Sequence, residues 1–267
     1  MHQNIESYQP EPDEVKKNKI RKIYSYVSLD PDEEETLNKF RAYVQKHSVS
    51  LPEWVDDEHR FALKMMESTK RKPKEAVKLT FEYIEWLNSM PVPLTDDVQN
   101  LLNQGTVYVT GMDYKFHPVI VVNQRRLINS QADLDLVLRA NYVVLNWIME
   151  NMIVPGKVET WSIIMDSTDV STRQMEMSKL KKLANNLSNY YPCRLNKSYQ
   201  VNTPSALYRL WQVLSMFLAS DTKQKVVIMK DNFAEVLRNE IPPHYLEEKY
   251  GGDRPNLESG FFPPSNL

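Results

Sequence analysis

The sequence predicts an α/β protein in which a helical N-terminal unit precedes a domain built on a mainly parallel, five-stranded sheet. Apolar residues recur every three or four positions through residues 31–90, which is typical of amphipathic helices. After residue 94, short strand-like runs alternate with helical periodicities, as in parallel sheets with crossover helices. The resulting segments are an arm (1–30), a helical unit (31–94), the sheet domain (95–253) and a tail (254–267).

The arm and the helical unit differ in composition. Residues 1–30 combine prolines and mixed charges with little apolar content, so we expect a flexible arm. Pro31 and the acids after it suit a helix N-terminus. The clearest helix is "KPKEAVKLTFEYIEWLNSM", in which Ala76, Leu79 and Tyr83 share one face. It ends at "PVPLT", because proline cannot continue a helix.

Five runs in the sheet domain have the composition of strands, and helical patterns separate most of them. A long, largely buried helix is expected over 133–154 and an amphipathic one over 177–187. The strand-like runs are "TVYVT" (106–110), "PVIVVN" (118–123), "WSIIMD" (161–166), "SYQV" (198–201) and "KVVIM" (225–229).

The segment 205–220, "SALYRLWQVLSMFLAS", predicts a helix that is apolar over about two-thirds of its circumference. Ser205, Arg209, Gln212 and Ser215 form one narrow polar stripe at 100° per residue. Surface helices usually have the reverse proportion. Two interpretations remain open: the helix is buried in the core, or it covers a hydrophobic cavity and meets a membrane or ligand with its other side.

Composition and charge exclude several classes of function. The net charge of -2 provides no global basic field, so we expect no nucleic-acid partner. Cys193 is the single cysteine, which excludes an internal disulfide and favours a reducing compartment. No stretch reaches 18 uninterrupted apolar residues, and the N-terminus lacks the apolar run of a signal peptide. We therefore expect a cytoplasmic protein.

The motifs of catalysis are missing from the sequence. It contains no GxGxxG, no GxxxxGK[ST] and no GxSxG, and its five histidines form no HExxH. We therefore predict no catalytic residues, no metal site and no cofactor. A nucleophilic Cys193 is the remaining enzymatic alternative, and full activity after Cys193→Ser would exclude it.

The order of motifs in the C-terminal half resembles one known family. "YYPCRLNKSYQVNTPSALYRLWQVLSMFLASDTKQKVVIM" contains Tyr-Pro-x-Arg, a strand, Asn-x-Pro, an apolar helix and a lysine at the next strand. "IIMDSTDVS" precedes it, and Tyr-Gly-Gly follows at 250–252. In this order the motifs resemble the Sec14-like, or CRAL-TRIO, lipid-binding domain family over about residues 55–253. The motif positions are Tyr191, Pro192, Arg194, Asn202, Pro204 and Lys225.

The resemblance implies a sheet that floors a hydrophobic pocket and a gate helix, at about 205–220, that closes it. It implies a monomeric, non-enzymatic carrier whose only ligand is a bound lipid and whose contact with membranes is transient. On this basis we expect binding and transfer of a phospholipid. Candidate pocket residues are Val119, Val121, Ile163, Met165, Tyr199 and Val201, and candidate gate residues are Tyr208, Trp211, Leu214 and Phe217.

The resemblance also implies a headgroup site at Lys225, Lys70 and Cys193, with one departure from the family pattern. Members that bind phosphatidylinositol carry a glutamate where this chain has Cys193. The positions that resemble the choline-lipid site are apolar: Val109, Ile120, Trp161 and Ile163. A sterol, fatty acid or isoprenoid therefore stays an alternative ligand. An interaction or regulatory module with the same fold stays an alternative function.

Overall fold

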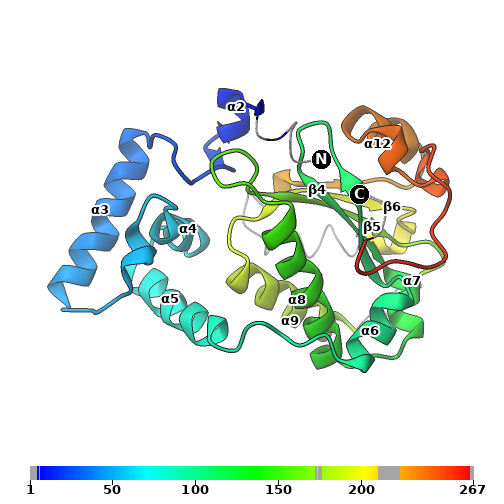
Figure 1. Ribbon diagram of the computed structural model, residues 1–267, viewed down its shortest axis with the longest axis horizontal. Helices are drawn as coiled ribbons and strands as arrows, with labels where there is room; N and C mark the ends of the chain where they lie inside the picture. The colour runs from blue at the N-terminus through cyan, green and yellow to red at the C-terminus, as the bar shows by residue number, and fades with distance from the viewer. Residues whose placement is uncertain (1–4, 6, 172, 174–175, 210–222, 265–267) are drawn as a thin grey trace.

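The computed structural model describes residues 5, 7–171, 173, 176–209 and 223–264. Its centre is a five-stranded sheet in the order β3-β4-β5-β6-β7 (Figure 1). β3 and β4 are antiparallel, and each later strand is parallel to the one before it. The predicted mainly parallel α/β architecture is therefore confirmed. The strands are β3 (Val107–Met112), β4 (Pro118–Asn123), β5 (Trp161–Asp166), β6 (Leu195–Val201) and β7 (Val226–Ile228).

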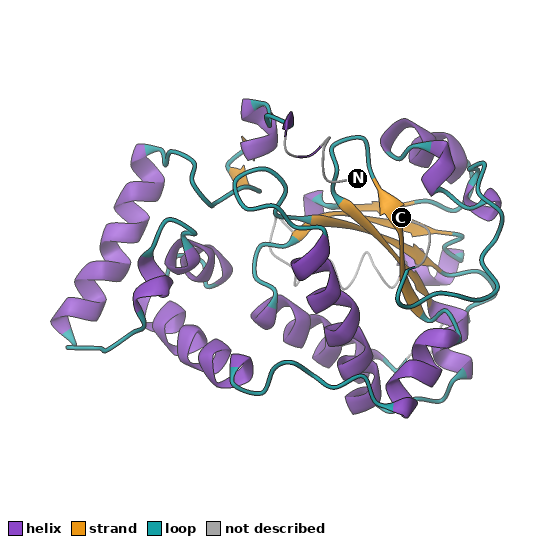
Figure 2. Cartoon of the chain, viewed as in Figure 1, coloured by secondary structure: helices purple, strands orange, loops and turns teal. Residues whose placement is uncertain are grey.

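Helices cover both faces of the sheet (Figure 2). One face, here called the α8 face, packs against α8 (Leu134–Asn151) and α9 (Met177–Tyr190). The opposite α12 face packs against α12 (Phe233–Glu240) and the segment that follows it. Two shorter helices, α6 (Asp96–Asn103) and α7 (Gln124–Asn129), lie before β3 and after β4.

The helical unit has a hydrophobic core of its own. Leu37, Met65 and Ala76 are fully buried in it, one from each main helix. The side chain of Asp30 accepts a hydrogen bond from the backbone N–H of Glu33 and caps the first of these helices. The unit consists of α3 (Pro31–Lys46), a 3₁₀ turn (Glu53–Asp56), α4 (Phe61–Ser68) and α5 (Pro73–Leu87).

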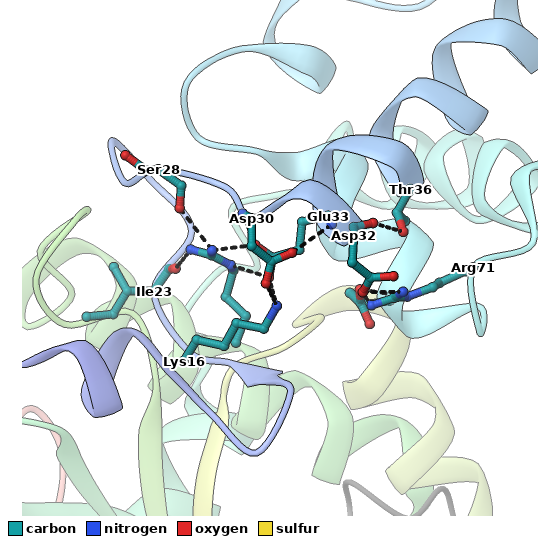
Figure 3. A network of polar contacts seen from close by, with 10 residues as sticks. Lys16, Ile23, Ser28, Asp30, Asp32, Glu33, Thr36 and Arg71 are labelled. Carbon is teal, nitrogen blue, oxygen red and sulfur yellow. Dashed lines mark hydrogen bonds and ion pairs between the residues drawn. The ribbon is translucent and has the colours of Figure 1, made fainter.

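The N-terminal arm forms a short helix, α2 (Pro12–Val15), and a hairpin of β1 (Lys16–Lys17) and β2 (Ile20–Arg21). Arg21 makes a bidentate ion pair with Glu33 of α3, with N–O distances of 2.7 and 2.5 Å. Lys16, which Figure 3 labels together with Glu33, pairs with the same carboxylate at 2.7 Å. These ion pairs join the segment to the helical unit. That the arm is flexible stays a prediction.

Within the part of the chain that the structure describes, no helix combines the length and the apolarity needed to cross a bilayer.

Candidate functional site

Strand register divides the six predicted pocket residues between the two faces of the sheet. Val119 lies opposite Ser162, whereas Ile120 lies opposite Ile163. Because side chains alternate along a strand, Ile163 and Met165 lie on the α8 face and the other four residues on the α12 face. Those four are at most 2% exposed and fill the core beneath α12: Val119, Val121, Tyr199 and Val201. The six residues are therefore divided between two faces of the sheet, and their contact with a lipid stays a prediction.

The α8 face is packed unevenly. Ile120 and Trp161, at its β3–β5 end, are buried against α8 and α9. Toward β7, the apolar side chains of Met165, Val226 and Ile228 are only half-buried. The face therefore keeps a partly open apolar strip along β5 and β7.

A polar pair from β6 lies within this apolar strip. Ser198 is opposite Ile163 and Val226, and Gln200 is opposite Met165 and Ile228. The Gln200 side-chain amide donates to Ser198 Oγ at 2.8 Å. The predicted pocket residues did not include Ser198, Gln200, Val226 or Ile228. Alternation from Ile163 and Met165 identifies them once the register is known.

The segment that leads into the predicted gate leaves the sheet at Asn202. This residue has a left-handed backbone (φ 53°), and its amide donates to Asp166 Oδ1 at 3.2 Å and Thr168 Oγ1 at 2.8 Å. Residues 205–209 are helical, and Tyr208 is 45% exposed. Trp211, Leu214 and Phe217 lie outside the described residues.

Two of the three predicted headgroup residues lie near the C-terminal end of α4. Cys193 Sγ is 3.8 Å from the carbonyl oxygen of Lys64 and 3.9 Å from Ser68 Oγ. Lys70 follows Ser68 by two residues and is exposed. Lys225 is half-buried at the start of β7, where its carbonyl oxygen accepts a hydrogen bond from the backbone N–H of Ser198 at 2.8 Å.

A buried carboxylate, Glu159, joins the arm, the helical unit and the sheet domain. Its side chain accepts hydrogen bonds from the backbone N–H groups of Ser25 at 2.7 Å and Gly156 at 3.1 Å, and from Lys64 Nζ at 3.1 Å. Burial by itself raises the pKa of Glu159, but the charges of Lys64 and Arg194 and these backbone bonds lower it to about 2. Arg194, from the Tyr-Pro-x-Arg motif, also donates to the Glu159 carbonyl oxygen at 2.8 Å.

An aromatic-lined cavity of about 410 Å³ lies between the helical unit and the sheet domain. The rings of Trp86 on α5 and Tyr190 on α9 stack in its wall with centroids 4.7 Å apart. Phe61 and Tyr83 line it from the helical unit, and Tyr191 lines it from the Tyr-Pro-x-Arg motif. Aromatic side chains from both units therefore line this cavity.

The CRAL/TRIO domain family model matches residues 102–252. The SEC14 cytosolic factor of Yarrowia lipolytica is 30% identical over 102 residues, 38% of this chain and 21% of that protein. The one from Eremothecium gossypii is 29% identical over 109 residues, 39% of this chain and 35% of that protein. The matched segment thus spans well under two-thirds of these relatives.

Two further matches cover most of the chain. Patellin-6 of Arabidopsis thaliana is 24% identical over 273 residues, covering 94% of this chain and 66% of that protein. The crystal structure of Sfh5 superposes with a TM-score of 0.62 at 16% identity, covering 87% of this chain and 91% of that one. At that identity the superposition establishes a shared fold.

Proposed function

Because this chain belongs to the CRAL/TRIO domain family, we propose that it binds a phospholipid against the α8 face and carries it between membranes. The observation that carries the proposal is the half-buried apolar strip of Met165, Val226 and Ile228. The apolar sequence of 205–220, which begins directly beyond this sheet, supports a gate over the strip.

The energetics of lipid transfer explain what such a site has to do. Exposing an acyl chain to water costs about 0.8 kcal/mol per CH₂. Moving a two-chain lipid with about 28 methylenes through water would therefore cost roughly 20 kcal/mol. A carrier lowers this barrier by offering an equivalent apolar surface and a lid. It forms no bond and uses no cofactor, and we propose that it works as a cytosolic monomer with transient membrane contact.

The polar pair on the strip suggests how the lipid is oriented. Ser198 and Gln200 are hydrogen-bonding side chains among apolar neighbours. A phospholipid ester or a sterol hydroxyl would satisfy them, because a polar group in an apolar site needs a partner. Val109, Ile120 and Trp161 are buried beside α8, so protein side chains fill the β3–β5 end of this face. The lipid chains would therefore lie at its β7 end.

Mass spectrometry of organic extracts tests this function. We expect about one lipid to co-purify with each protein molecule. Met165→Trp should lower that occupancy several-fold because it adds bulk to the α8 face. Val227→Trp is the matched control, since Val227 is also half-buried but lies on the α12 face. Wild-type protein without any lipid would contradict the proposal and favour the interaction or regulatory module.

A further inference from the structure

The aromatic-lined cavity between the helical unit and the sheet domain is separate from the strip proposed to bind lipid. Its volume of about 410 Å³ is within the range of small-molecule pockets, about 300–1,000 Å³. Among the described residues that line it, none belongs to the strip or to the predicted headgroup positions. The lining comes from α4, α5, α8, α9 and the Tyr-Pro-x-Arg motif. The cavity therefore offers space for a ligand of its own.

The walls of this cavity are aromatic rings that pack on one another. Trp86 and Tyr190 are stacked with an interplanar angle of 7°, and Tyr191 meets Trp86 edge-on with centroids 5.5 Å apart. Phe61 and Tyr83, both from the helical unit, pack with centroids 4.6 Å apart. A further planar ring can stack on such surfaces or meet them edge-on, which gives an attraction beyond the burial of its area. The walls therefore favour a ligand that contains an aromatic ring.

The charged residues of the lining favour an anion. The side chains of Lys64 and Arg194 are 7% and 15% exposed, and they lie 3.1 and 3.9 Å from one carboxylate, that of Glu159. Glu159 itself is outside the lining, whereas Glu150, which is part of it, is exposed at the end of α8 and screened by solvent. Two cations beside one carboxylate leave a positive charge where water is partly excluded. An anion is attracted there more strongly than in bulk water.

Arg194 has hydrogen-bond donors left for such an anion. Its Nη1 donates to the Glu159 carbonyl oxygen at 2.8 Å. Within the residues that the structure describes, neither Nε nor Nη2 of Arg194 has a hydrogen-bond partner. These two nitrogens form one edge of the planar guanidinium, and such an edge matches the two oxygens of a carboxylate. The lining thus combines ring surfaces with a group that recognises a carboxylate.

We propose that this cavity binds a small carboxylic acid that carries an aromatic ring. The ring packs against the aromatic walls, and the carboxylate accepts hydrogen bonds from Nε and Nη2 of Arg194. A fatty acid would meet the same guanidinium but would leave the walls without an aromatic partner. The inference does not depend on lipid binding, because the strip and the cavity share no described residue.

Titration calorimetry of the wild-type protein tests the class of ligand. The probes are indole-3-propionate, its neutral amide indole-3-propionamide, and hexanoate, which has the carboxylate without a ring. We expect indole-3-propionate to bind about tenfold or more tightly than the amide, since hydrogen bonds between charged groups are the stronger ones. Hexanoate should also bind more weakly, because it lacks the ring contacts. No binding of indole-3-propionate, or equal affinity for either control probe, would overturn the inference.

Two variants test whether the probe lies in the cavity. Arg194→Lys keeps the charge but removes the planar edge, so it should weaken binding of indole-3-propionate about tenfold. Met149→Trp adds bulk to the lining and should weaken binding at least as much. Leu138→Trp is the matched control, since Leu138 is also half-buried on α8 but lies outside the lining. Met165→Trp should bind the probe like the wild-type protein, because Met165 lies on the strip.

A spectroscopic measurement distinguishes a ligand-binding arginine from a structural one. Indole-3-propionate should shift the ¹⁵N resonance of Arg194 Nε, which is assigned by its absence from the spectrum of Arg194→Lys. The Nε resonance of Arg41, which pairs with Asp56 in the helical unit, should stay in place. A structural role alone predicts that the probe shifts neither resonance.

The remaining outcomes either support or overturn the inference. Wild-type affinity in either Arg194→Lys or Met149→Trp would overturn it. Loss of binding in Met165→Trp would assign the probe to the strip and would overturn it too. Because the acid and the amide are compared on the wild-type protein, that comparison decides even where a variant fails to fold. If no lipid co-purifies but indole-3-propionate binds as expected, the proposed function fails while this inference stands.

Discussion

At the scale of single residues, Glu159 has a structural role at a position that no motif marks. It is 2% exposed, and its carboxylate joins Ser25 of the arm, Lys64 of the helical unit and Gly156 of the sheet domain. A carboxylate with this many donors remains ionised although it is buried. Removing the charge should therefore weaken the contact between all three segments.

Glu159→Gln should lower the free energy of unfolding by about 3 kcal/mol at pH 7. Folding lowers the pKa of this carboxyl from 4.5 to about 2, and each unit corresponds to about 1.4 kcal/mol. A lowered folded-state pKa gives stability that is present above pH 4.5 and is lost as the pH falls toward 2. Urea unfolding from pH 3 to pH 8 should show the gap to the wild-type protein closing in acid. Glu53→Gln, an exposed control, should track the wild-type protein.

At the scale of elements, the sequence located every strand of the sheet but not the pairing of the strands. "PVIVVN" and "WSIIMD" are both continuous apolar runs, so alternation within each run cannot show which residues share a face. Register depends on contacts between strands: Ile163 lies opposite Ile120, and the pocket residues chosen from β4 therefore fell on the α12 face. The ion pair between Arg21 of the arm and Glu33 of α3 could not be predicted for a related reason, because no local pattern in either segment encodes it.

The arm should detach when Arg21 is replaced by methionine. The Arg21 side chain is 5% exposed, and its guanidinium contacts Glu33, the Ile23 carbonyl oxygen and the Ser28 carbonyl oxygen. Breaking a buried ion pair costs about 3–5 kcal/mol. We expect much faster tryptic cleavage between residues 17 and 22, measured by mass spectrometry. Arg41→Met removes an exposed pair with Asp56 and should leave cleavage between residues 17 and 22 unchanged. Equal cleavage of both variants would contradict the anchoring role.

At the scale of the whole molecule, the order of motifs was more informative than any single residue. The matches to Tyr-Pro-x-Arg, Asn-x-Pro and Tyr-Gly-Gly indicated the family, and the family model covers 102–252. What the motifs did not reveal is how the units are joined. Glu159 and the Trp86–Tyr190 stack depend on contacts between distant segments, which local periodicity does not encode.

Lipid transfer should depend on the apolar surface of 205–220 more than on apolar surface elsewhere in the molecule. Leu214→Asp and Phe217→Asp should each abolish transfer between liposomes, because an ionised side chain on the proposed gate opposes both closure over a lipid and entry into a bilayer. Circular dichroism and melting should stay close to wild type. Val236→Asp is the control, since this residue is 38% exposed on α12, against the other face of the sheet. Transfer rates that are unchanged in both gate variants, or equally reduced in the control, would refute a gate at this position and leave the strip on the α8 face without its lid.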